Sequence, residues 1–369
     1  MPLPFPLDVL RLTAEVMAIA ALFGGCAKAP GAPPLDTPDT PPTRLETAER
    51  GLAPLTPRET ELRFELAGTV RHLADDIGER NPTQRWELAD AADYLAGELE
   101  TAGYEVERQG HTIDDDVVAQ NLIVQVGGGR KGNEIVVVGA HYDSAAGSPG
   151  ASDATGIAAL LALARSLHDF DSLRTLRFVA FGVSHAPHAQ TAKMGSMVYA
   201  KKLAEAGEEV VAMVGLESLG YYSKTAGSQK PPSGLEGAYP DTGDFVSFVG
   251  DMRAGELVGG MMRVFADHAS ITAREAVLVE PTDGLGASDS WAFAQLGFPA
   301  ITVTDTGTLR NPGQGTGRDK PDTLDFESAA RVVAGLEIAL RKLAGEDQPL
   351  PQPEDLKEEA KAPDRRTGG

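Results

Sequence analysis

Four acidic or imidazole side chains lie where apolar, strand-like segments of this sequence end. His141 and Asp143 come directly after the branched apolar run 135–138, and Glu217 ends another apolar run. Asp153 follows a Gly/Pro-rich turn and opens an Ala/Leu-rich helical pattern. In α/β sheets such residues gather at the carboxyl edge of the strands, and imidazole and carboxylate are ligands that zinc accepts. The sequence therefore predicts a metal site.

Ser184 and His185 follow a further apolar run, residues 176–181. They do not form a nucleophile pair, because adjacent residues on an extended segment point to opposite sides. The Gly-x-Ser-x-Gly motif is also broken, since Ala186 stands at its last position. His185 could instead bind a metal with Asp153, as a weak second site of two ligands, and His188 could act as a substitute base. An interpretation of both histidines as loop residues without a role is equally open.

A structural interpretation also exists for the acidic residues, which could simply cap strands and helices. Asp153 in particular stands where a helix begins, and aspartate is a good residue for the N-cap position. Four such coincidences at strand ends favour a present or former metal site over capping. Trp291 and Phe293 are expected to pack beneath this site rather than to bind substrate.

The elements that must position these residues alternate between strands and helices. This alternation predicts a three-layer α/β fold, with a mixed, mostly parallel sheet and helices on both faces. His141, Ser184, His185, Glu217 and Thr304 would then line one rim of the sheet. The predicted strands are residues 104–108, 121–126, 135–138, 176–181, 210–216, 245–249, 276–279 and 298–304, and the predicted helices are 60–77, 88–99, 157–167, 196–206, 256–266 and 324–343.

The N-terminal segment predicts export. Cys26, the single cysteine of the chain, follows the apolar stretch 16–25, which has the length of a signal-peptide core and is too short to span a membrane. We expect a signal peptide with a lipobox over residues 1–26 and a lipid anchor at Cys26, or a start at Met17. The protein would be a periplasmic or cell-envelope lipoprotein. The other open interpretation is an apolar N-terminus with an incidental buried thiol.

Composition divides the rest of the chain into three parts. Residues 27–57 are rich in proline and predict an extended linker, residues 58–345 predict one α/β domain, and residues 346–369 predict a charged, disordered tail. The formal net charge of −21 argues against nucleic acid as a partner and against an anionic membrane surface. The membrane would be reached only through the lipid anchor.

Several short motifs, taken in order along residues 60–343, resemble the zinc aminopeptidases with a co-catalytic di-zinc site. This is family twenty-eight of the metallopeptidases, which also includes glutaminyl cyclases and the transferrin-receptor ectodomain. The motifs are His-Tyr-Asp-Ser at 141–144, Pro-Gly-Ala-Ser-Asp at 149–153, Phe-Val-Ala-Phe at 178–181, Met-Gly-Ser at 194–196, Leu-Glu-Ser-Leu-Gly at 216–220, Ser-Asp at 288–289, Thr-Asp-Thr at 304–306, Arg-Asn-Pro at 310–312 and Asp-Thr-Leu-Asp at 322–325.

The resemblance implies roles for individual residues. His141, Asp153 and Glu217 would hold one zinc ion, and Asp143 would orient the His141 ring. The family's general base falls at Ser184 and a ligand of its second zinc at His185. The family's last histidine ligand falls at Ser290, and the loop before Asp153 is shorter than in the family.

These replacements predict a degraded catalytic site. A serine hydroxyl does not accept a proton as a carboxylate does, and loss of a general base lowers a rate by about 10²–10⁴-fold. We therefore expect one zinc ion per chain or none, with weak or absent hydrolysis of peptide bonds at peptide or protein N-termini. Two classes stay open, namely an impaired exopeptidase and a non-catalytic module that binds peptides or proteins.

Overall fold

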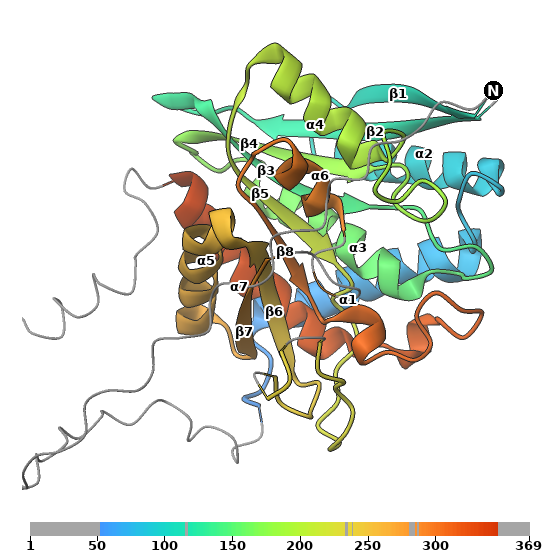
Figure 1. The fold of residues 1–369 in the computed structure, drawn as a ribbon, viewed down its shortest axis with the longest axis vertical. Coiled ribbons are helices and arrows are strands. Elements are labelled where there is room, and N and C mark those ends of the chain that lie inside the picture. The colour runs from blue at the N-terminus through green and yellow to red at the C-terminus, as the bar shows by residue number, and fades with distance from the viewer. Residues whose placement is uncertain are drawn as a thin grey trace, which may run out of the picture. The chain divides into compact units, whose positions relative to one another are not determined.

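One mixed sheet of eight strands organises the described part of the chain in the computed structural model of this protein (Figure 1). The structure describes residues 52–114, 117–232, 235–237, 239–279, 285 and 288–345. The strands are β1 (Glu107–Asp114), β2 (Val117–Val126), β3 (Lys131–His141), β4 (Arg174–Phe181), β5 (Glu209–Glu217), β6 (Phe245–Asp251), β7 (Thr272–Leu278) and β8 (Ala300–Thr304). Their order across the sheet is β1-β2-β4-β3-β5-β8-β6-β7.

The four central strands, β4, β3, β5 and β8, run parallel to one another. His141 pairs with Phe181, and Glu217 pairs with Thr304, so the four carboxyl ends meet at one edge. The outer strands are different, because β1, β2 and β4 pair in antiparallel fashion, as do β6 and β8. The mixed, mostly parallel α/β sheet predicted from the sequence is confirmed.

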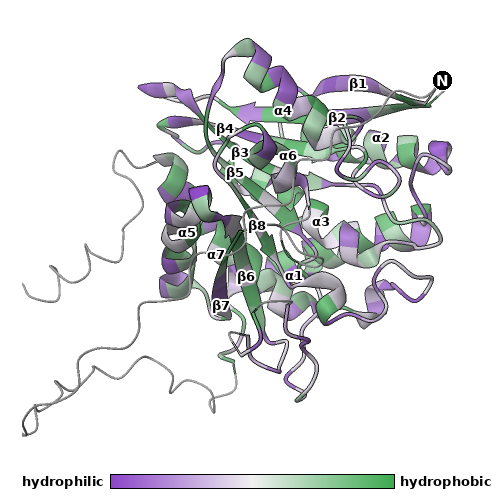
Figure 2. Ribbon diagram, in the orientation of Figure 1, coloured by the Kyte–Doolittle hydropathy of each residue, from purple (hydrophilic) through white to green (hydrophobic). Residues whose placement is uncertain are grey.

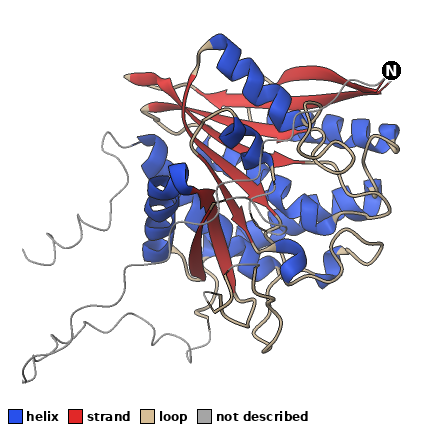
Figure 3. Ribbon diagram, in the orientation of Figure 1, coloured by secondary structure: helices blue, strands red, loops and turns tan. Residues whose placement is uncertain are grey.

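Helices cover both faces of this sheet, as Figure 3 shows. Their bounds are α1 (Pro57–Arg71), α2 (Arg85–Thr101), α3 (Ala151–Leu167), α4 (Gly195–Ala206), α5 (Gly255–His268), α6 (Asp289–Gln295) and α7 (Phe326–Gly345). A π-helical turn, His72–Ile77, follows α1, and short 3-10 turns occupy Met252–Ala254, Gly307–Leu309 and Pro321–Thr323.

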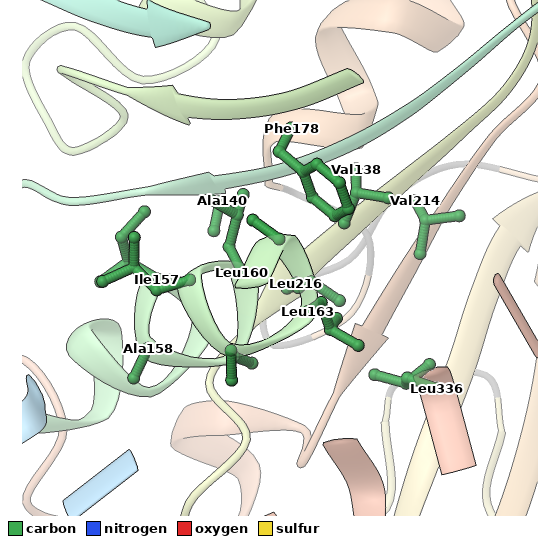
Figure 4. Close-up of a cluster of buried hydrophobic side chains, with 14 of the residues drawn as sticks. Val138, Ala140, Ile157, Ala158, Leu160, Leu163, Phe178, Val214, Leu216 and Leu336 are labelled. Carbon is green, nitrogen blue, oxygen red and sulfur yellow. The ribbon is translucent and has the colours of Figure 1, made fainter. Parts of the chain in front are cut away.

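Alternate residues of each central strand enter two separate cores. Val136 and Val138 of β3 pack with α1, α2, α3, α5 and α7, and Figure 4 shows Val138 beside Phe178 of β4. Ile135 and Val137 point to the other face, where α4 and α6 lie. Both faces are therefore apolar, and much of the central strands is green in Figure 2.

Helix α3 lies unusually close to the sheet because of one glycine. A Cβ atom on Gly156 would come within 2.4 Å of the Leu216 carbonyl oxygen on β5. The helix begins after Gly150, whose φ of 64° is left-handed and which carries no side chain to cap the helix. The first turn of α3, with Asp153, is thereby set against the ends of β3 and β5.

Several predicted boundaries were wrong, and three of them have a local reason. Helix α3 begins at Ala151 rather than 157, because the Gly/Pro turn ends at Gly150. The first edge strand was predicted at 104–108 and lies at Glu107–Asp114, since Tyr104 is buried and donates its hydroxyl hydrogen to the Ala164 carbonyl on α3. Strand β7 begins at Thr272 rather than 276, because it is an edge strand whose first residues are polar.

The predictions for the two ends of the chain lie outside the described residues. These are the signal peptide and lipid anchor at Cys26, most of the linker and the tail after residue 345. Among the described helices, none combines the length and the apolar character that crossing a membrane requires.

Candidate metal centre

Three side chains that the sequence places on three different segments meet at the carboxyl edge of the sheet. His141 ends β3, His185 lies in the segment after β4, and Asp153 lies in the first turn of α3. One possible ligand atom from each lies within 4.8 Å of the other two. His141 and Asp153 are buried and His185 is partly buried. The two imidazole rings meet edge to face, with centroids 5.0 Å apart.

Polar atoms in this cluster are buried without hydrogen-bond partners. Both carboxylate oxygens of Asp153 and Nε2 of His185 lack one, although Asp153 Oδ2 lies 3.3 Å from that nitrogen. Asp153 caps nothing, because the N-cap of α3 is Gly150 and the Asp153 carboxylate accepts no hydrogen bond from the first turn. Buried polar groups without partners carry a free-energy penalty unless a ligand or ion satisfies them. The capping interpretation of Asp153 is therefore wrong.

Asp143 fixes the orientation of the His141 ring. Its Oδ1 atom lies 3.1 Å from His141 Nδ1, which leaves Nε2 turned into the cluster. The Asp143 carboxylate also accepts hydrogen bonds from the backbone nitrogens of Ser184 (2.9 Å) and His185 (3.1 Å). One carboxylate thus sets both the ring of His141 and the segment that carries His185. This is the orienting position that the sequence assigned to it.

Glu217 stands at the exposed side of the cluster. Its Oε2 atom lies 3.2 Å from His141 Nε2, and its side chain is 22% exposed. The cluster of mutually close ligand atoms contains His185 and does not contain Glu217. The ligand set predicted from the sequence was His141, Asp153 and Glu217, with His185 added as a weaker candidate. In the structure His185 is the more central of these two.

Charge in the cluster is strongly coupled. Burial opposes ionisation of Asp153, but the His185 and His141 imidazoles and Arg80 together hold the pKa of its carboxyl below the usual value. Burial likewise opposes a positive charge on His185, yet Asp153 and Asp143 raise the pKa of its imidazole. Glu217 and Asp143 raise the pKa of His141 against the same effect of burial. In the absence of a cation, protons are therefore held between these carboxylates and imidazoles.

The Arg80 side chain holds the loop between His141 and Asp153 in place. Its side chain is fully buried, and its Nε atom donates to the Tyr142 carbonyl at 2.7 Å. The two terminal nitrogens donate to the carbonyls of Pro149 (2.6 Å) and Gly150 (2.8 Å), and to two carbonyls at the end of the first helical segment. The guanidinium therefore joins the ends of the loop that separates His141 from Asp153.

The two serines at the family's catalytic positions have different surroundings. The Ser184 hydroxyl donates to Asp289 Oδ1 at 2.6 Å. Ser290 is buried, and its hydroxyl lies 2.5 Å from that of Thr302 on β8. The Ser290 hydroxyl is therefore bonded to a side chain of the sheet. It takes no part in the cluster of close ligand atoms.

The structure separates the remaining predicted residues from the cluster. His188 is buried in the turn after His185, and it is absent from the cluster of close ligand atoms. Phe293 is fully buried and Trp291 packs against the same core, on the α4 and α6 face of the sheet. Both aromatic residues pack beneath the site, as predicted.

Three residues at the site were not assigned a role from the sequence. Arg80 and Asp319 carry no sequence signal, since each is a single charge in a segment without a recognisable spacing. Asp319 accepts hydrogen bonds from the backbone nitrogen and hydroxyl of Ser152, and so holds the first turn of α3. Asp289 was noted as part of a Ser-Asp motif, and its contact with Ser184 depends on tertiary structure alone.

The donor set fits a zinc ion. Two imidazoles and one carboxylate are a common set in catalytic zinc sites, where a fourth position is left for water or substrate. The orphaned oxygens of Asp153 and the orphaned nitrogen of His185 are the atoms that an ion would satisfy. Asp143 on the far side of the His141 ring is the usual orienting partner of such a ligand.

Comparison with known proteins agrees with this picture of the fold. Residues 121–336 match the model of "Peptidase family M28". A protein of Escherichia coli (strain K12), described as "Uncharacterized protein YfbL", is 30% identical over 293 residues, which cover 77% of this chain and 88% of that protein.

Solved structures with the same fold include peptidases and a cyclase. The zinc aminopeptidase BSAP from Bacillus subtilis aligns with a TM-score of 0.62 at 14% identity, over 78% of this chain and 96% of that one. An aminopeptidase from Aneurinibacillus sp. strain AM-1 gives 0.60 at 15% identity, over 80% and 97%. Glutaminyl cyclase from Porphyromonas gingivalis gives 0.57 at 17% identity, over 76% and 98%. The resemblance stated from the motifs is thus confirmed, and the chain belongs to peptidase family M28.

Proposed function

We propose that this protein is a metal-dependent exopeptidase of the aminopeptidase type that works slowly with a single metal ion. The observation that carries the proposal is the buried cluster of His141, Asp153 and His185, with Asp153 oxygens that have no other partner. Membership of the family supports peptides as the substrate class and zinc as the metal. The degraded second half of the site supports slow turnover.

His141, Asp153 and His185 would hold the ion, with Glu217 beside them. A bound zinc ion supplies Lewis acidity, which polarises a carbonyl group and lowers the pKa of water. Asp143 keeps the His141 ring oriented, and Arg80 keeps the loop before Asp153 closed. Glu217 is partly exposed and can contact a substrate that enters from the solvent side.

We also propose that the protein is exported and anchored in the cell envelope by a lipid on Cys26. The apolar stretch before that cysteine and the proline-rich residues after it support this location. The substrates would then be N-termini of peptides or proteins outside the cytoplasm.

A second candidate is a non-catalytic module that binds peptides or a protein partner at the same site. It is favoured by Ser184 and Ser290, which replace a carboxylate base and an imidazole ligand. The Ser290 hydroxyl is bonded to Thr302 of the sheet, and a serine is a poor substitute for an imidazole ligand.

Metal analysis and peptidase assays on the same samples distinguish these candidates. We expect about one zinc ion per purified chain, and slow, chelator-sensitive hydrolysis of aminoacyl-nitroanilides. His185→Ala should lose both the metal and the activity, whereas His188→Ala, a change in the same loop outside the cluster, should keep both. Zinc-free protein without turnover would refute the peptidase, and two zinc ions per chain with rapid turnover would refute the single-metal site.

A further inference from the structure

A second buried carboxylate lies beside the metal cluster and belongs to none of the ligand positions. Asp289 is the first residue of α6 and is 2% exposed. Its Oδ1 atom accepts the Ser184 hydroxyl hydrogen at 2.6 Å, across 105 residues of sequence. A carboxylate is rarely buried in this way unless it is paired or has a chemical role.

Ser184 is held in place from its backbone side as well. Its amide nitrogen donates to both oxygens of Asp143, the residue that orients His141. Ser184 is therefore held by two buried carboxylates, by Asp143 through its amide and by Asp289 through its hydroxyl. A serine that donates its hydrogen to a carboxylate keeps its oxygen lone pairs free to accept another hydrogen bond.

We propose that Asp289 acts through Ser184 as the proton acceptor of this peptidase, in place of a carboxylate in direct reach of the attacking water. The inference depends on the proposed function. In this arrangement Ser184 is the catalytic residue, because its hydroxyl contacts the attacking water. Asp289 is a positioning residue, which acts through Ser184 and holds the transferred proton.

The proposed transfer is balanced in atoms and charge. A water molecule gives one proton to Ser184 Oγ while the Ser184 hydroxyl proton moves to Asp289 Oδ1. The oxygen left behind forms a bond to the scissile carbonyl carbon. The proton then returns from Asp289 by the same route to the amine nitrogen, as the carbon–nitrogen bond breaks.

The surroundings of Asp289 suit a proton acceptor near neutral pH. Burial raises the pKa of its carboxyl to about 6, the nearby Glu217 acts in the same direction, and His141, Ser184 and Ser196 act against it. General bases work best when the pKa lies near the working pH. Glu217, the other carboxylate within reach, is directed at His141 Nε2 instead.

The test compares Asp289→Asn, Ser184→Ala and the double variant with Ser290→Ala. Ser290 is the matched control, since it lies next to Asp289 in sequence and its hydroxyl bonds to Thr302 of β8 rather than to Asp289. We expect kcat to fall about 100-fold in each of the first two variants, with KM and bound zinc unchanged. The double variant should be no slower than either single one, because the two groups act as a unit. Ser290→Ala should stay within threefold of wild type.

Two further measurements exclude a merely structural effect. The decrease of kcat/KM at acidic pH in the wild type should be lost in Asp289→Asn. Infrared difference spectra of the metal-free protein between pH 5 and 7 should contain a protonated-carboxyl band that Asp289→Asn removes. Ser184→Ala should shift this band, because the hydrogen bond is lost, and Ser290→Ala should not.

The proposal is wrong if Asp289→Asn and Ser184→Ala both keep the wild-type activity and the wild-type decrease of kcat/KM at acidic pH. If Ser184→Ala does not shift the frequency of the carboxyl band, the hydrogen bond between Ser184 and Asp289 does not exist in solution, and the proposal loses its basis. These outcomes differ from failure of the proposed function, in which the wild-type chain itself holds no zinc and has no turnover.

Discussion

Replacement of Arg80 by methionine tests how the loop before Asp153 is held. Methionine keeps most of the length of the side chain and removes the guanidinium with its five contacts to backbone carbonyls. Those carbonyls are at the end of the first helical segment and in the loop from Tyr142 to Gly150. The change also removes the positive charge that stabilises ionised Asp153.

The size of the effect follows from burial. Hydrogen bonds to charged groups contribute about 1.5–3 kcal/mol each, and relaxation of the loop will recover part of the loss. Removing one partner of a buried charge pair typically lowers stability by about 3–5 kcal/mol. We therefore expect the free energy of unfolding to fall by about 3–5 kcal/mol in Arg80→Met.

Urea unfolding of the metal-free protein, followed by fluorescence and circular dichroism, measures this difference. The matched control is Arg165→Met, which removes a partly exposed arginine paired with Glu98. A surface pair contributes about 0–1 kcal/mol, so this variant should unfold near the wild-type midpoint. If Arg80→Met also stayed within about 1 kcal/mol of wild type, the loop would not depend on the guanidinium, and the reasoning would be wrong.

Three further predictions concern the elements around the site. Gly156→Ala should destabilise the fold by about 1–3 kcal/mol in thermal unfolding, because a Cβ would meet a backbone oxygen of β5 at 2.4 Å. The control Gly97→Ala lies in an open position of α2 and should be neutral or stabilising. Equal effects of the two substitutions would refute the close-packing argument. Ser290→His should lower the melting temperature and add no second zinc ion by elemental analysis, because the position faces β8; a gain of one ion would contradict this. Burial and the nearby Asp153 raise the pKa of Asp319 to about 6, above the value of about 3.9 expected in the unfolded chain. The folded protein thus binds more protons between these values and loses stability as pH rises from about 4 to 6. Asp319→Asn keeps the acceptor oxygen used by Ser152. In urea titrations of metal-free protein, the stability of this variant relative to wild type should therefore increase as pH rises over that range. A difference in stability that does not change with pH would contradict the raised pKa of Asp319.

Much of this protein could be predicted from short stretches of its sequence. The parallel strands are unbroken apolar runs such as 135–138, because both faces of the sheet are covered. His141, Asp153 and Glu217 were identified because strand ends and the following turns place such residues at one edge. These signals are local, so they can be recognised without knowledge of the rest of the fold. The edge strand β7 lacked them at its start, since much of it is exposed and three of its first four residues are polar.

Tertiary structure alone decided which of these side chains meet. His185 approaches Asp153 because the segment after β4 is tied to Asp143, and the sequence could not rank His185 above Glu217 for that reason. The contact between Ser184 and Asp289 joins segments 105 residues apart. Contacts of this kind depend on where the helices cross the sheet, and small shifts of a helix would break them. The sequence by itself determined the fold and most of the candidate ligands, whereas the packing of α3 and α6 on the sheet determined how these ligands and their proton-accepting neighbours are arranged.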